Sequence, residues 1–292
     1  MNTMTIQRKD AKTQRSQRKA EEWAMRVATN FAASGRPSFS HWPTFKTLRS
    51  LRLCAFALKQ GCLKILLLSL LPLSASAADL PARFTAIYDV KKGPITIGET
   101  RRTLMPDGPN RFVFESVTRP TGVSRLLRSG QVVERSRWTW HGRHLRPLEY
   151  TWFSRGGERP RTLHLKFDWS QRKLTNTVNG DPWQMPLTDD LTVDKLLFQL
   201  RLMHDLPTTQ RRLRYPVADG GKLKMYDLEI LGVETIRIPS GTYQTVRVRR
   251  SNGPLQTTFW CARKLHYLPV RIERRRADGS TINAVLTSVA GF

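Results

Sequence analysis

The chain has 292 residues and carries 49 Lys and Arg against 23 Asp and Glu, which gives a formal net charge of +26. Hydrophobic residues make up 39% and charged residues 25% of the sequence, which excludes both a wholly disordered chain and a multispanning membrane protein. The 18 Gly and 3 Cys also exclude a collagen-like fibre and a disulfide-stapled scaffold, so we expect a globular body with its own core.

The first stretch, residues 1–50, is polar and basic, and we expect it to be a disordered leader. Two interpretations remain open. The stretch is an arm that binds nucleic acid or a membrane surface, or the start codon has been placed too early. We favour the second interpretation, because signal peptides rarely carry so long a charged region before their apolar core.

Residues 51–77 have the pattern of a secretory signal peptide. Ile65–Leu73 is an uncharged run that follows Lys64 and precedes the small residues Ala75-Ser76-Ala77. A membrane-spanning helix needs ~20 apolar residues, so a retained anchor is the less favoured interpretation. The pattern predicts export, cleavage after Ala77 and a mature chain of residues 78–292 that forms a single β domain without a transmembrane span.

The basic character continues beyond the predicted cleavage site. From Ala78 onward there are 36 Lys and Arg against 20 Asp and Glu, and 28 of these bases are Arg. Arg suits bidentate contacts to phosphate or carboxylate better than Lys does, although Arg-rich codon usage explains the excess equally well. Cys261 is the only cysteine in this part of the chain, which excludes an intramolecular disulfide, and its apolar surroundings predict a buried thiol.

Alternating apolar and polar residues dominate the chain from Ala82 onward, which is typical of strands with one face on a core. Turns that contain Gly or Pro, such as Asn179-Gly180, separate these stretches. The pattern predicts a long antiparallel meander of roughly eleven or twelve strands, and a sheet of that size must curl or close. The expected strands include Ala82–Val90, Ile95–Met105, Arg111–Arg119, Gln131–Trp140, Leu145–Ser154, Leu223–Leu231, Tyr243–Arg250 and Thr281–Ser288.

One segment breaks the alternation. Thr192–Leu206 has apolar residues at helical spacing, and it predicts a helix. Asp189 and Asp190 precede this segment and are expected to cap its free amides, while Pro207 ends it. Because the apolar arc is wide, we expect the helix to be buried as a plug beside the curved sheet, with most of its turns inside the core.

Several short stretches follow one another in a distinctive order across residues 80–286. They are Tyr88-Asp89-Val90, Ile97-Gly98-Glu99, Leu145-Arg146-Pro147-Leu148-Glu149-Tyr150, Phe167-Asp168, Asp189-Asp190-Leu191-Thr192, Ile238-Pro239-Ser240-Gly241-Thr242-Tyr243 and Phe259-Trp260. Their order and spacing resemble a bacterial exported family known as domain-of-unknown-function family 3108. One departure is that the family commonly reads Asp-Pro-Leu-Ser where this chain has Asp190-Leu191-Thr192.

The resemblance implies a fold and a compartment. Members of that family are expected to be periplasmic, mainly β proteins with a large curved antiparallel sheet, shaped like a spiral β-roll or an unclosed barrel. This shape is distantly similar to that of the lipoprotein carriers of the Gram-negative envelope. The resemblance carries over no catalytic residue.

Aromatic side chains in the strands, with two leucines of the expected helix, are the candidates for binding an apolar ligand. They are Trp138, Trp140, Tyr150, Trp152, Trp169, Leu197 and Leu200. Ordinary core packing is the favoured alternative explanation of these residues. Interleaved Arg and aromatic residues also suit single-stranded nucleic acid, but export from the cytoplasm argues against that partner.

Metal and acid–base chemistry are less favoured. His141 and His144 lie in a turn without the further ligands that zinc needs, so we expect no metal and no cofactor. A cluster of ionisable groups surrounds the expected helix: Asp189, Asp190, Asp194, His204 and Asp205. Helix capping explains this cluster more simply than catalysis does, because the chain has no nucleophile elbow, phosphate loop or metalloprotease helix.

Together these observations predict a periplasmic, non-enzymatic binding protein. It would act as a carrier or adaptor for an apolar or anionic envelope component, with a lipid, a glycan or an envelope protein as partner. One alternative is a scaffold that binds a protein through an Arg-rich face without a small ligand. The other is a hydrolase that uses Asp190, Asp194 or His204. A cavity lined by Trp and Leu would favour the carrier, and a solid interior would favour the scaffold.

Overall fold

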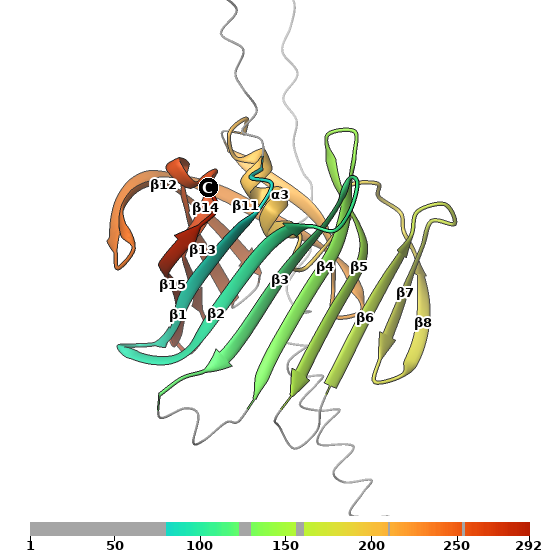
Figure 1. Ribbon diagram of the computed structural model, residues 1–292, viewed down its shortest axis with the longest axis horizontal. Helices are drawn as coiled ribbons and strands as arrows, with labels where there is room; N and C mark the ends of the chain where they lie inside the picture. The colour runs from blue at the N-terminus through green and yellow to red at the C-terminus, as the bar shows by residue number, and fades with distance from the viewer. Residues whose placement is uncertain (1–79, 123–129, 156–160, 210, 253–254) are drawn as a thin grey trace, which may run out of the picture. The chain divides into compact units, whose positions relative to one another are not determined.

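Fifteen strands join in one sheet in the computed structural model, which describes residues 80–122, 130–155, 161–209, 211–252 and 255–292 (Figure 1). The expected leader and signal peptide lie outside the described residues. Ser76–Phe292 form one compact unit of the chain. Among the described residues, none of the helical segments has the length and hydropathy that a membrane crossing requires.

The first half of the sheet is a meander in which each strand pairs with the next in antiparallel fashion. Its strands are β1 (Phe84–Lys92), β2 (Ile95–Pro106), β3 (Arg111–Pro120), β4 (Gln131–His141), β5 (His144–Arg155), β6 (Arg161–Asp168), β7 (Lys173–Val178) and β8 (Asp181–Pro186). The turn between β7 and β8 consists of Asn179 and Gly180, and both have positive φ, at 53° and 100°. This Asn-Gly pair makes the two-residue turn that the sequence indicates.

The rest of the chain forms the second half of the sheet and the helical segments. They are β9 (Val193–Asp194), α3 (Phe198–Asp205), β10 (Arg212–Asp219), β11 (Lys222–Ile238), β12 (Gly241–Asn252), β13 (Leu255–Ala262), the 3-10 turn η1 (Arg263–Leu265), β14 (Leu268–Arg275) and β15 (Thr281–Ala290). Strands β10–β15 form a second antiparallel meander, and β9 pairs with β10 in parallel.

The two halves meet where β1 pairs with β15. The sheet therefore has the order β8 to β1 followed by β15 to β9, with β8 and β9 at its two edges. The predicted fold class, a large curved unclosed sheet that is mainly β, is confirmed. The prediction of one long meander is wrong at one point, because β8 and β9 follow each other along the chain but lie at opposite edges of the sheet, and β1 pairs with β15 instead.

The number and length of the strands also differ from the prediction. The sheet has 15 strands rather than eleven or twelve. The expected strand Leu223–Leu231 continues as β11 to Ile238, because Gly232 forms a bulge at φ +127° and shifts the register without ending the strand. A bulge of this kind bends a strand and leaves its pairing intact on both sides.

The predicted helix is present but begins later than expected. It covers Phe198–Asp205 rather than Thr192–Leu206, because Val193 and Asp194 pair with β10 as the short strand β9. The helix ends ahead of Pro207, as predicted.

The predicted capping of the helix by Asp189 and Asp190 is wrong. The carboxylate of Asp189 accepts a hydrogen bond from the N–H of Leu191, at 2.8 Å, outside the helix. The carboxylate of Asp194 instead accepts the N–H groups of Leu196 and Leu197 at 2.9 and 2.8 Å. Asp194 thus satisfies free amides in the turn that leads into α3.

The segment from β9 through α3 connects the two halves of the curled sheet. The ring of Phe198 lies 5.3 to 6.2 Å from the rings of Tyr215, Tyr226 and Phe259 in the second half. On the other side, the hydroxyl of Ser136 in β4 donates to the carboxylate of Asp194 at 2.5 Å. In Figure 1 the strands β1–β8 lie in front, the orange and red strands curve behind them, and α3 lies at the upper end. The helix is therefore a buried plug, as expected.

The core confirms the expected burial of Cys261. Cys261 in β13 is fully buried, and burial raises the pKa of its thiol well above the usual range. A thiol in such surroundings behaves as a small apolar side chain.

Candidate functional site

The inner face of the curled sheet encloses a cavity of about 390 Å³ between β1–β5 and β11–β15, which we call the interior cavity. This volume lies within the range of about 300–1,000 Å³ that is usual for small-molecule sites. Much of its wall is apolar, with contributions from both halves of the sheet and from α3. The apolar side chains include Val132, Trp152, Phe198, Phe259, Ile272 and Ile282.

The same cavity carries an excess of positive charge. Among the described residues, four cationic side chains line it, Arg102, Lys195, Arg250 and Arg274, against the single carboxylate of Glu134. Because cations on an apolar wall are weakly hydrated, a negative charge inside the cavity would be strongly attracted.

Glu134 already has a cationic partner within the cavity wall. Lys195 Nζ lies 2.7 Å from Glu134 Oε1, and the hydroxyl of Tyr150 donates to the same oxygen at 3.1 Å. Burial alone would raise the pKa of the Glu134 carboxyl, but the charge and hydrogen bond of Lys195 outweigh burial and hold this pKa below its usual range. Glu134 and Lys195 therefore form an ion pair, and the arginines remain as the excess charge.

Arg250, Thr257 and Arg274 form a row across three neighbouring strands. In the sheet register Arg250 of β12 lies opposite Thr257 of β13, and Thr257 lies opposite Arg274 of β14. Arg250 is 7% exposed and Thr257 is 3% exposed. The Nε of Arg250 and the hydroxyl of Thr257 are buried without a hydrogen-bond partner. The row thus presents unused donors at the cavity wall.

Aromatic rings hold two of these arginines in place. The guanidinium of Arg250 lies 3.9 Å from the centre of the Tyr226 ring, and that of Arg102 lies 5.0 Å from the centre of the Tyr88 ring. Such cation–π contacts fix the orientation of a guanidinium without neutralising its charge. Arg274 lines the same cavity and is an exposed residue.

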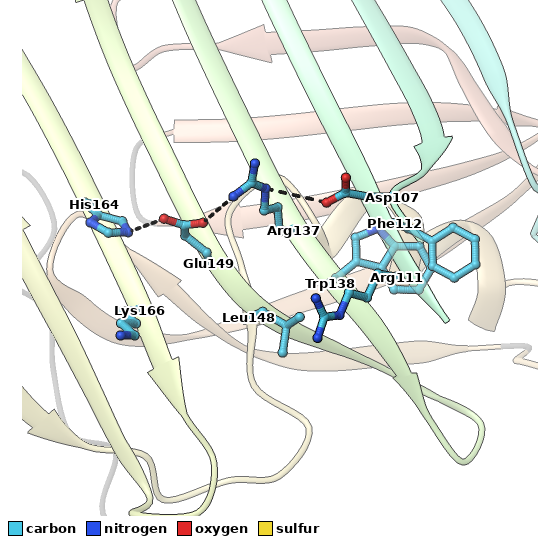
Figure 2. A pocket seen from close by; sticks show the side chains of 9 residues that line it. All are labelled: Asp107, Arg111, Phe112, Arg137, Trp138, Leu148, Glu149, His164 and Lys166. Carbon is cyan, nitrogen blue, oxygen red and sulfur yellow. Dashed lines mark hydrogen bonds and ion pairs between the residues drawn. The ribbon is translucent and has the colours of Figure 1, made fainter. Parts of the chain in front are cut away.

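A second hollow, of about 470 Å³, lies on the outer face of β3–β6, and we call it the outer pocket (Figure 2). Figure 2 shows a chain of polar contacts across it, from Asp107 through Arg137 and Glu149 to His164. Their distances are 3.7, 3.3 and 2.6 Å in that order. These side chains are a third to a half exposed and already pair with one another, so the outer pocket offers a ligand less unused charge than the interior cavity does.

The sequence comparison decides the family. Residues 84–287 match the family described as "Protein of unknown function (DUF3108)". The chain belongs to this family. The search of curated proteins gave no significant match.

One solved structure resembles this DUF3108 protein in fold. A β-barrel-like protein of the domain of unknown function DUF1849 from Brucella abortus aligns with a TM-score of 0.50 at 9% identity, and the alignment covers 73% of this chain and 99% of that one. At this identity the likeness shows the fold alone. A protein from Parabacteroides distasonis, provisionally described as a lipoprotein, aligns with a TM-score of 0.29 at 9% identity over 72% of this chain and 97% of that one.

The seven residues proposed for ligand binding occupy different places in the DUF3108 fold. Trp152 lines the interior cavity, whereas Trp138, Tyr150, Leu197 and Leu200 are at most 1% exposed in the core. Trp140 packs edge-on against Trp138 and beside His204, and Trp169 stacks on Phe167 with Arg146 over its ring. The described residues that line the interior cavity include no Leu. They include four cationic side chains, so the wall is more cationic than the sequence indicated.

The arginines of the cavity are absent from the candidate residues that the sequence indicated. Strand parity contains the missing signal. Arg250 shares the phase of Val246 and Val248, which are buried, and Arg274 shares the phase of Ile272. Since side chains on one face recur every second residue, both arginines belong to the inner face.

The residues proposed for acid–base chemistry have separate partners in this DUF3108 chain. Asp190 pairs with Arg172 at 2.9 Å on the surface, and Asp194 is bonded to Ser136 in the core. His204 Nδ1 lies 2.8 Å from Asp205, which also pairs with Arg201. His141 and His144 face each other at the β4–β5 turn, and within the described part of the chain no group of three or more His, Cys, Asp or Glu could hold a metal ion.

Proposed function

We propose that this protein is an exported, non-enzymatic carrier or adaptor that holds an apolar or anionic component of the cell envelope in the interior cavity. The observation that carries the proposal is the composition of the cavity wall, which combines apolar side chains from both halves of the sheet with a surplus of cations. A wall of this kind favours a ligand with an apolar part and a negative charge.

The non-catalytic part of the proposal is supported by the state of the candidate carboxylates. Asp194 is fully buried and accepts hydrogen bonds from Ser136, Leu196 and Leu197, so its oxygens are engaged in holding the chain. A general acid or base must reach the proton of a substrate, and a fully buried, fully bonded carboxylate is poorly placed for that role.

Export to the periplasm is supported by the sequence alone. The uncharged run Ile65–Leu73 and the small residues Ala75-Ser76-Ala77 have the order that a signal peptidase substrate requires. Expression of the full chain in a Gram-negative host, followed by fractionation and intact-mass measurement, tests this. A periplasmic product that begins at Ala78 is expected, and full-length protein in the cytoplasm would contradict export.

Native mass spectrometry of the protein purified from the periplasm tests the carrier. We expect a species heavier than the bare chain by the mass of a lipid, glycan or peptide, and we expect extraction with organic solvent to remove this mass. Repeated preparations that contain only the bare chain would contradict the carrier. Cross-linking that recovers a protein partner from those same preparations would support a scaffold instead.

A matched pair of variants tests whether the ligand binds in the interior cavity. Ala284→Phe adds a ring to the cavity wall, whereas Ala290→Phe adds the same ring at an exposed position of the same strand. The first change should reduce the occupied fraction and the second should not. Circular dichroism of both variants shows whether the sheet is intact. Equal occupancy in two folded variants would remove the interior cavity as the site.

A further inference from the structure

The arginines of this protein fall into two groups according to their partners. Buried Arg201 pairs with Asp205 at 2.7 Å, and on the outer face Arg135 and Arg249 pair with glutamates at 2.6 and 2.9 Å. Among the described residues no carboxylate makes an ion pair with Arg250 or Arg274. Arg250 and Arg274 thus differ from Arg135, Arg201 and Arg249 in having no acidic partner within the described part of the chain.

An unpaired, largely buried cation is costly to a folded protein. Desolvation of a charge without a partner destabilises the native state, as does the loss of one partner of a buried ion pair. Arg250 is 7% exposed and is fixed by the Tyr226 ring, so it cannot turn towards solvent without losing that contact. A bound anion would remove this cost.

The geometry of the row suits an oxyanion. Directly opposed side chains on neighbouring strands have Cβ atoms about 4.5–5.5 Å apart, so the side chains of Arg250 and Arg274 start on either side of Thr257 on one face of the sheet. Guanidinium groups present paired N–H donors that match the oxygens of phosphate and carboxylate. The hydroxyl of Thr257, which is buried without a partner, adds one more donor between them.

The surroundings of the row suit an apolar chain. Phe259 lies two residues from Thr257 on β13, Ile272 lies two residues from Arg274 on β14, and both line the same cavity together with Phe198. An anionic group at the row would therefore continue into an apolar part of the ligand.

We propose that Arg250, Thr257 and Arg274 form an anion site that binds the phosphate or carboxylate group of an acyl-chain amphiphile in the interior cavity. This inference rests on the proposed function and specifies the class of its ligand.

Three probes with the same chain length test the proposal on the purified protein by isothermal titration calorimetry below micelle concentrations. Dodecyl phosphate and laurate carry the two candidate anions, and monododecanoyl glycerol is the neutral control. Both anionic probes, or one of them, should bind at least about tenfold more tightly than the neutral probe, as charged hydrogen bonds of this kind allow. The tighter of the two identifies the head group.

The matched variants are Arg274→Gln and Arg275→Gln, at neighbouring positions of β14. Arg274 faces the cavity, whereas the side chain of Arg275 is 60% exposed and contacts Glu273. Arg274→Gln should weaken anionic binding about tenfold and leave binding of the neutral probe within about twofold. Arg275→Gln should change neither. Since Arg274 is accessible, its substitution should leave the protein folded.

A second variant separates binding from a structural role. Thr257→Val keeps the shape of the side chain and removes a hydroxyl that has no partner, so the free protein should be equally or more stable to urea. Affinity for the anionic probes should nevertheless fall.

The outcomes that overturn the proposal are distinct from those that overturn the carrier. If all three probes bind equally and Arg274→Gln behaves like Arg275→Gln, the anion site is wrong and the carrier remains. If none of the probes binds, the anion site is wrong, and the native mass spectrometry of the periplasmic protein decides separately whether the carrier stands.

Discussion

Replacement of Asp194 with Asn should change how the stability of the protein depends on pH. Burial is the main cause that raises the pKa of the Asp194 carboxyl to about 6 from its ordinary value of 3.8, and the nearby charge of Glu134 adds to it. Hydrogen bonds from Ser136, Leu196 and Leu197 oppose this effect but do not outweigh burial. A difference of about two pKa units corresponds to about 3 kcal/mol.

The direction in which stability changes with pH follows from which state of the protein, folded or unfolded, binds the Asp194 proton more tightly. The folded protein holds the Asp194 proton up to about pH 6, whereas the unfolded chain loses it near pH 4. The stability that this group contributes is therefore fully present below pH 4 and is lost as the pH rises through 6. Asn cannot ionise, so Asp194→Asn should become more stable relative to the wild type by about 3 kcal/mol between pH 4 and pH 7.

Urea unfolding followed by tryptophan fluorescence at several pH values measures this difference. Other carboxyl groups titrate in the same range, but they are common to both proteins and cancel in the comparison. The matched control is Asp190→Asn, which changes an exposed carboxylate paired with Arg172 and should alter stability by less than about 1 kcal/mol. If the difference between Asp194→Asn and the wild type is constant from pH 4 to pH 7, burial does not control this carboxyl and the reasoning fails.

Two further substitutions test the packing of the fold by urea unfolding. Gly221→Ala should cost about 1–3 kcal/mol more than Gly220→Ala, because a Cβ at Gly221 would lie 2.4 Å from Asn176 Nδ2 while Gly220 faces open space, although both have positive φ. Equal costs would contradict this close approach. Lys195→Met should cost about 1–2 kcal/mol at pH 7, because Glu134 would lose the cation 2.7 Å away, and an unchanged unfolding midpoint would show that this ion pair does not stabilise the cavity wall.

The strands were predictable because the signal for each one is local. Alternation of apolar and polar residues located the expected strands to within a few residues in most cases, and Asn179-Gly180 marked its turn correctly. The continuation of β11 was missed because Gly232 looks like a turn residue, while in the fold it occupies a bulge. A glycine with positive φ occurs in turns and in β-bulges, and only the pairing with the neighbouring strand distinguishes the two.

Features that depend on distant parts of the chain could not be predicted from local patterns. The pairing of β1 with β15 and the parallel contact of β9 with β10 join segments whose sequences carry no mark of each other. That contact also explains the late start of α3, because Val193 is held as a strand although its spacing suits a helix.

The candidate site was predictable only in part. Trp152 was identified as a ligand-binding candidate and lines the cavity. Parity places Arg250 and Arg274 on the inner face, but it does not show that they lack acidic partners, since that depends on side chains from other strands. Only the curled sheet brings these arginines and Trp152 to the same cavity.

A crystal structure of the protein with dodecyl phosphate tests the central claim most directly. The account predicts phosphate oxygens within hydrogen-bond distance of Arg250, Thr257 and Arg274, and the dodecyl chain along Phe198 and Ile272 inside the sheet. A phosphate bound only on the outer face, with the interior cavity free of the dodecyl chain, would contradict it.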